Sequence, residues 1–115
     1  MLTKIVALLK TGDVKNVVVF GVKKLPEVPY VVVKPETAPT GRRFRVIIHF
    51  APGQQILLED YVRTVLALLS EYQATSRHGA INRLGRGQIT SDIIADNRDD
   101  SISMEAAFLM PTHSF

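Results

Sequence analysis

Cysteine is absent from all 115 residues of the chain. Without thiols there are no disulfides, no thiolate nucleophile and no cysteine-ligated zinc site, and such a composition suits a reducing compartment such as the cytoplasm. Long apolar runs are missing as well, since none approaches the roughly 20 residues that a helix needs to span a bilayer. The first apolar stretch, 5–9, is shorter than the roughly 7 residues of a secretory signal core. We therefore expect neither a membrane span nor an export signal.

The chain also lacks a strong excess of charge of one sign. Its 14 basic and 11 acidic residues give a formal net charge of +3, which is too even a balance to indicate nucleic-acid binding by itself. Hydrophobic residues make up 46% of the chain, a share that is typical of globular proteins and argues against disorder. A chain of 115 residues can build one core but not two, so we predict a single domain over residues 1–115.

The clearest pattern that is present lies between Phe44 and Tyr72. Apolar residues first alternate along the chain and then, after a break at Pro52-Gly53, recur every three or four residues. The first pattern predicts a strand, and the second predicts an amphipathic helix that extends to Tyr72. Because both apolar stripes need cover, we expect the helix to pack against the strand. The residues expected to meet are Phe44, Val46, Ile48, Phe50, Val65, Leu66 and Leu69.

Four segments precede this pair. Residues 2–9 are amphipathic and predict a short helix, with Gly12 as its left-handed stop. The segments 16–24 and 29–34 are rich in β-branched residues and predict the two strands of a hairpin. Residues 36–42, with proline and glycine among small polar residues, predict an exposed loop.

After the long helix, residues 75–103 show no sustained hydrophobic period and predict a long loop, whereas 104–110 alternate and predict a last strand. The predicted order is α-β-β-β-α-loop-β, an α+β fold with a mainly antiparallel sheet and a long helix packed on one face. The stretches 17–20 and 30–33 are apolar on both faces, so both faces of their strands need cover. Either the N-terminal helix covers the second face or a neighbouring subunit does.

Candidate catalytic and metal-binding groups are scattered. His49, His78 and His113 are far apart, and none has a carboxylate or a second histidine at ligand spacing. No serine or threonine lies in a nucleophile elbow, and 85–88 is neither a phosphate loop nor a dinucleotide fingerprint. The acidic tract 96–100 lacks the glycine and the glutamate of a calcium loop. We expect no catalytic residue, cofactor or metal, since an enzyme would need a pocket that the sequence does not reveal.

Charge is segregated along the predicted long loop, whose first part is basic and whose second part is acidic. One interpretation is a solvated loop that keeps the protein soluble. The other is that one end docks on the opposite end of an adjacent copy, in head-to-tail contacts that close into a ring and use charge to set register. Loops of this length are usually functional, or disordered until a partner orders them. The candidate interface residues are Arg77, Arg83, Arg86, Asp92, Asp96, Asp99 and Asp100.

A second basic group, Arg42, Arg43 and Arg45, lies at the start of the central strand. Arg43 and Arg45 fall on the strand face opposite the apolar stripe. If that face lines a channel, it presents positive charge to passing DNA without reading the DNA sequence. The alternative is a nucleic-acid-binding module that adds lysines of the preceding segments and binds phosphates with a steep salt dependence. No aromatic pair for stacking bases is found, so sequence-specific RNA recognition is not expected.

In element order and texture, the chain resembles the tail-terminator (tail-completion) proteins of long-tailed bacteriophages, and more loosely their neck proteins. The resemblance rests on 2–9, 16–34, 43–50, 57–72 and 104–110, and the long loop is a departure from it. It implies a structural protein of the virion that forms a hexameric ring at the tail–neck junction and is assembled in the host cytoplasm. Its partners would be further copies of itself, the tail-tube protein and the head-tail connector, with DNA passing through unread. The resemblance implies no membrane and no catalytic residue.

Overall fold

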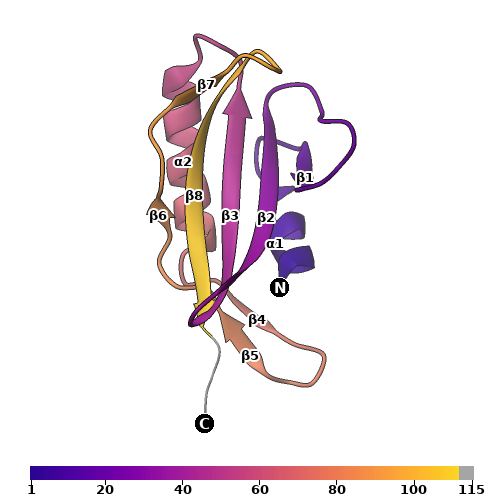
Figure 1. Cartoon of the computed structure of the whole chain (residues 1–115). Coiled ribbons are helices and arrows are strands. Elements are labelled where there is room, and N and C mark those ends of the chain that lie inside the picture. Colours follow the sequence, from indigo (N-terminus) through magenta and orange to yellow (C-terminus); the bar gives the residue numbers. More distant parts are fainter. Residues whose placement is uncertain (112–115) are drawn as a thin grey trace.

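Three long antiparallel strands form the centre of a six-stranded sheet whose order is β1-β2-β3-β8-β6, with β7 also paired with β8 (Figure 1). The computed structural model describes residues 1–111. The sheet consists of β1 (Val17–Val19), β2 (Tyr30–Ala38), β3 (Gly41–Phe50), β6 (Gln88–Ile89), β7 (Ile94–Asp96) and β8 (Ser101–Pro111). The remaining two strands, β4 (Gln73–Thr75) and β5 (Ile81–Arg83), form a separate hairpin. The domain is therefore of the α+β class with a mostly antiparallel mixed sheet, as predicted.

Both helices, α1 (Leu2–Leu9) and α2 (Gln55–Leu69), lie on the same face of the sheet (Figure 1). The core forms between this face and the helices, and it includes Ile5 and Leu9 of α1. The prediction that α1 could cover the second face is therefore wrong. We call the face without helices the open face. Its residues Tyr30 and Val32 are already buried within the single chain, and cover of the rest by a neighbouring subunit stays a prediction.

The predicted contact between β3 and the following helix is present. Phe44, Val46 and Ile48 are fully buried on one face of β3, in the same core as Val65 and Leu69 of α2. Leu66 differs from the expectation, because it is only half-buried at the edge of this core.

The helix α2 is shorter than predicted and does not reach Tyr72. Ser70, its C-cap, is extended at φ −60° and ψ 127°. Glu71 then adopts a left-handed φ of 61°, so two successive residues leave the helical region. Tyr72 packs against the core from beyond the end of the helix instead.

The predicted hairpin of 16–24 with 29–34 is wrong, because β1 pairs with β2 in parallel. The antiparallel neighbour of β2 is β3, and their ladder continues from Tyr30–His49 to Ala38–Gly41. This long ladder also replaces the exposed loop predicted at 36–42. Pro35 had indicated a strand end, but proline is tolerated at the edge of a sheet, and β1 does not extend as far as Pro35.

The predicted loop 75–103 contains β5, β6, β7 and the start of β8, so the predicted element order is wrong here. These short strands show no period in the sequence, yet β6 and β7 both pair with β8. Between them, the Thr90 amide donates to the Glu105 carbonyl at 2.9 Å. Leu84, in the same segment, is fully buried. The segment forms one edge of the sheet.

Neither described helix is long and apolar enough to cross a membrane.

Candidate interaction surface

The open face combines polar side chains from the three long strands, because residues paired across strands point to the same side. Its apolar residues Val32 and Ile47 lie between two polar groups, one near each end of the strands. From the register, the open face consists of Tyr30, Val32, Lys34, Glu36, Arg43, Arg45, Ile47, His49, Ser101, Ser103, Glu105, Ala107 and Leu109.

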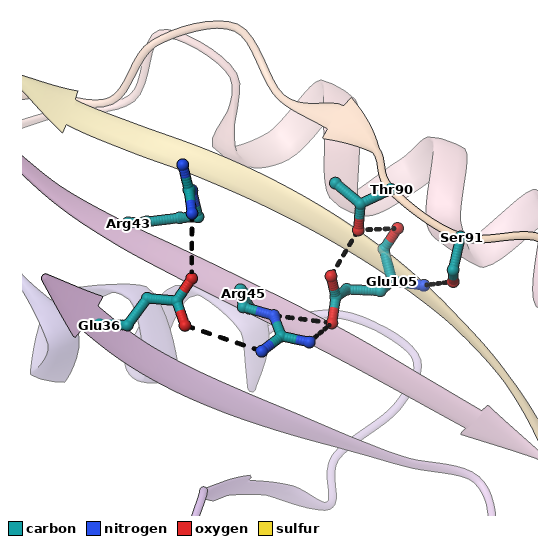
Figure 2. Close-up of polar contacts among 6 residues, drawn as sticks. All are labelled: Glu36, Arg43, Arg45, Thr90, Ser91 and Glu105. Atoms are coloured by element: carbon teal, nitrogen blue, oxygen red, sulfur yellow. Dashed lines mark hydrogen bonds and ion pairs between the residues drawn. The ribbon is translucent and has the colours of Figure 1, made fainter. Parts of the chain in front are cut away.

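The first polar group, which we call the Arg45 cluster, links three strands by charge (Figure 2). Arg45 of β3 donates to Glu105 of β8 through Nε at 2.9 Å and through Nη2 at 2.5 Å. On its other side, Arg45 Nη1 lies 3.7 Å from Glu36 of β2. Glu36 also accepts from Arg43 at 3.2 Å. Arg45 thus lies between two carboxylates.

The protonation of these groups follows from their contacts. The hydrogen bonds with Glu105 raise the pKa of Arg45. Burial acts to raise the pKa of Glu105, but hydrogen bonds from Arg45 and Thr90 outweigh it, so this pKa is lowered. Arg45 and Glu105 are therefore both ionised near neutral pH, and the formal charges of the two arginines and two glutamates of the cluster balance.

The predicted channel residues are consequently not one basic patch. Arg43 and Arg45 are on the open face, as expected, but both are paired with carboxylates. Arg42 points to the opposite face, where its guanidinium lies 5.6 Å from the centroid of the Phe44 ring. The alternation of side chains along β3 separates Arg42 from its neighbours.

The second polar group, which we call the His49 cluster, ties the turn before β8 to the sheet. The His49 ring stacks on the Tyr30 ring, with centroids 4.4 Å apart and planes inclined by 11°. His49 Nδ1 is 3.0 Å from the Ser101 hydroxyl, which in turn donates to Asp99 at 2.7 Å. The Tyr30 hydroxyl donates to the other oxygen of Asp99. The Asp99 carboxylate therefore accepts hydrogen bonds from side chains of two strands, β2 and β8.

Burial lowers the pKa of His49, although the nearby Asp99 and Asp96 oppose the shift. Burial also acts to raise the pKa of Asp99, but hydrogen bonds from Ser101 and Tyr30 outweigh it, and the pKa is lowered. Burial and the bond to Asp99 both raise the pKa of the Tyr30 hydroxyl. The cluster is thus built for a neutral histidine next to an ionised aspartate.

The His49 cluster contains serine, histidine and aspartate, but its geometry does not suit nucleophilic catalysis. Ser101 is only 2% exposed, so a substrate cannot approach its hydroxyl. Both Ser101 and Asp99 lie on the Nδ1 side of His49, whereas a catalytic base needs its two ring nitrogens for different partners.

The chain contains two further histidines. His78 is exposed on the β4–β5 turn, and His113 lies outside the described residues. Within residues 1–111, no three side chains form a metal-binding group.

The predicted interface residues are separated by the fold. The arginines lie on or near the β4–β5 hairpin, and the last two aspartates lie in the turn between β7 and β8, at the other end of the elongated domain (Figure 1). Arg83 pairs with Glu71 at 3.3 Å. Asp96 accepts from the Arg98 amide at 2.9 Å, and Asp99 belongs to the His49 cluster. Within residues 1–111, Arg77, Arg86 and Asp92 are exposed without an ion pair.

Sequence reasoning missed two exposed apolar sites. One surrounds a hollow of about 410 Å³, lined by Phe20, Val22, Leu25 and Val32 next to the β1 edge. The other is formed by Ile56 and Leu57 in the first turn of α2. The β-branched run 16–24 had indicated a longer strand, which concealed the first site.

No model of a known protein family matches the chain, and a comparison with curated proteins finds no match either.

Proposed function

We propose that this protein is a structural subunit of a bacteriophage virion, which forms a ring that caps the tail tube and joins it to the head-tail connector. The observation that carries the proposal is the arrangement of both helices on one face, which leaves an open face of cross-strand ion pairs. Such a surface suits contact with other macromolecules. It offers no enclosed catalytic site among the described residues, so we propose a non-enzymatic role.

The composition of the open face suits a channel for DNA. The Arg45 cluster presents both signs of charge on neighbouring strands. A balanced surface attracts the phosphate backbone less than a basic one, because fewer counterions are released on contact. DNA could then pass without sequence readout and without being retained. We propose a hexamer at the tail–neck junction, with the tail-tube protein and the connector as its neighbours.

The contact between copies by loop charges remains part of the proposal, in a reduced form. Arg77, Arg86, Asp92 and Asp100 are exposed and available to a neighbour. Asp99 is less available, since it binds Tyr30 and Ser101 within its own chain.

The nucleic-acid-binding alternative has less support. It needs free cations on one surface, whereas Arg42 lies on the opposite face from Arg45, and Arg45 is enclosed by two carboxylates. Exposed lysines at 23 and 24 would have to supply most of the binding.

The experiment that separates these functions is native mass spectrometry of the full chain, combined with a gel-shift assay using duplex DNA at low and physiological salt. A ring with no stable DNA complex is expected. A monomer that shifts DNA, with an affinity that falls steeply with salt, would replace the ring by the nucleic-acid-binding module. Negative-stain images should show a central opening.

A further inference from the structure

Phe20 lies on the surface, unlike the other described phenylalanines. Phe44, Phe50 and Phe108 are buried, whereas Phe20 is 59% exposed. Val22 and Leu25 are exposed beside it. Together with Val32 they line the hollow of about 410 Å³, which we call the Phe20 hollow. A monomer gains nothing from exposing three large apolar side chains within six residues, so this site is suited to a partner.

The rim of the Phe20 hollow is basic. Lys34 Nζ lies 4.6 Å from the centroid of the Phe20 ring. Lys23 lines the hollow, and Lys24 is exposed next to it. Glu27 is the one acidic residue of segment 20–29. Within the described part of the chain, none of the three lysines has an ion pair, so the partner should bring carboxylates next to an apolar side chain.

The same chain carries such a partner surface at the start of α2. Ile56 is 76% exposed, more than any other large apolar side chain among residues 1–111, and Leu57 is exposed beside it. Glu59 and Asp60 follow three and four residues after Ile56, a spacing that places them on the same side of the helix. Asp60 also has an exposed ion pair with Arg63 at 3.6 Å, which a partner would have to compete with. Ile56, Leu57, Glu59 and Asp60 form what we call the Ile56 ridge.

We propose that the Ile56 ridge of one copy docks in the Phe20 hollow of the next copy, with the two carboxylates against the lysines of the rim. This inference rests on the proposed ring function and names its subunit contact. The two surfaces differ, so every copy in a chain of contacts presents both. A head-to-tail contact of this kind closes into a ring when its rotation allows, and otherwise forms a filament.

Along the part of β2 that extends beyond β1, docking by side chains is favoured over addition of a strand. The Val31 amide donates to the Asn16 carbonyl, and the Phe20 amide donates to the Val33 carbonyl. The backbone N–H and C=O groups of odd-numbered β2 residues therefore point away from β3, to the side on which β1 lies. Pro35 is the next odd-numbered residue beyond β1, and it has no amide hydrogen to offer an added strand.

The contact divides its roles between apolar and charged groups. Insertion of Ile56 and Leu57 beside Phe20 removes apolar surface from water and supplies most of the affinity. Exposed charge pairs contribute little affinity, but they select the register and make association sensitive to salt.

The test measures self-association of the full chain by sedimentation equilibrium at low salt, with circular dichroism to check folding. Ile56→Ser should weaken self-association by about tenfold or more, as removal of an apolar interface anchor does. The control is Ile81→Ser, which changes another exposed isoleucine, on β5 and 59% exposed, and should leave self-association unchanged. Reversal of Lys23 and Lys24 to Glu should weaken assembly, and adding Glu59→Lys and Asp60→Lys should restore part of it.

Each outcome decides a different statement. A ring that ignores the Ile56 and lysine changes overturns this contact and leaves the ring function in place, whatever the effect of Ile81→Ser. An open filament that depends on Ile56 supports the contact and overturns the ring function. A chain that remains monomeric at every concentration overturns both. Recovery in the fourfold charge swap supports the pairing of lysines with carboxylates.

Discussion

Leu66 and Leu69 lie on the same helix, but their environments differ. Leu69 is fully buried, whereas Leu66 is half-buried and contacts the segment that contains Gly87. We expect Leu69→Ala to lower the free energy of unfolding by about 2–5 kcal/mol, as deep leucine truncations do. Leu66→Ala should lower it by only about 1 kcal/mol. Urea unfolding of both variants measures the difference, and equal losses would contradict it.

Gly87 is a residue whose absent side chain matters. A Cβ at this position would lie 2.2 Å from Cε2 of Phe108 and 2.7 Å from Cδ2 of Leu66. Gly87→Ala should therefore lower the free energy of unfolding by about 1–3 kcal/mol through overpacking. Combining it with Leu66→Ala should recover only part of the loss, because the Phe108 ring remains in the way. Full recovery in urea unfolding would show that Phe108 moves freely.

His49 predicts how stability depends on pH. Its pKa is lowered from 6.5 in the folded chain by burial, so the unfolded chain binds the proton more readily and stability falls as pH drops below about 6.5. The lowered pKa of Asp99 acts in the same direction, but only below about pH 4. Thermal unfolding should therefore show a smaller loss between pH 7 and pH 5 for His49→Gln than for the unmodified chain. Parallel curves would place the pH sensitivity elsewhere.

At the scale of elements, the Arg45 cluster connects β2, β3 and β8 by side chains in addition to their backbone ladders. Glu105→Gln would weaken two charge-assisted hydrogen bonds to a guanidinium that is partly buried. We expect a loss of about 1–3 kcal/mol in the free energy of unfolding. Glu36→Gln is the matched control and should cost less, since its contact to Arg45 is 3.7 Å long. A larger loss of stability for Glu36→Gln than for Glu105→Gln would show that Glu36 is the more important partner of Arg45.

The edge formed by residues 84–96, which include β6 and β7, is hydrogen-bonded to β8, although the sequence predicts a mobile loop there. Its amides at Gly85 and Thr90 donate to β8 at 2.7 and 2.9 Å. Limited proteolysis of the monomer should therefore spare 84–96 and cut first at the exposed β4–β5 turn near Gly79. Rapid cleavage within 84–96 would restore the prediction of a loop that is ordered only by assembly.

At the scale of the whole molecule, the domain extends 48 × 24 × 23 Å. The β4–β5 hairpin, which contains Arg83, and the β7–β8 turn, which contains Asp99 and Asp100, lie at opposite ends of the domain (Figure 1). Reversing Asp99 would disrupt the His49 cluster as well as any contact between copies. Asp92→Lys with Asp100→Asn avoids this, since both residues are exposed and asparagine tolerates the φ of 52° at position 100. If these charges set register, assembly at low salt should weaken, and Arg86→Glu should restore part of it. Sedimentation that shows no change would leave the loop as a solvated surface.

Hydrophobic periodicity in the sequence is enough to predict the elements that are long enough to show a clear apolar stripe. These are α1, the strand–helix pair of β3 and α2, the last strand and the α+β class, because each apolar stripe specifies one buried face. A strand as short as the two-residue β6 shows no repeating hydrophobic pattern, so the sequence cannot predict it. Such strands form because β8 offers them a partner.

The tertiary structure alone decided which faces meet and which charges are free. A β-branched run predicts a strand but not the direction of the strand that it pairs with. One edge of β2 is occupied by the long antiparallel ladder with β3, and β1 pairs in parallel with the other edge. Arg42, Arg43 and Arg45 are neighbours in the sequence, but the carboxylates that pair with Arg43 and Arg45 come from two other strands, β2 and β8. The exposure of Phe20 likewise depends on where both helices pack. Contacts between distant segments are a property of the folded chain, and they decide which surfaces remain for a partner.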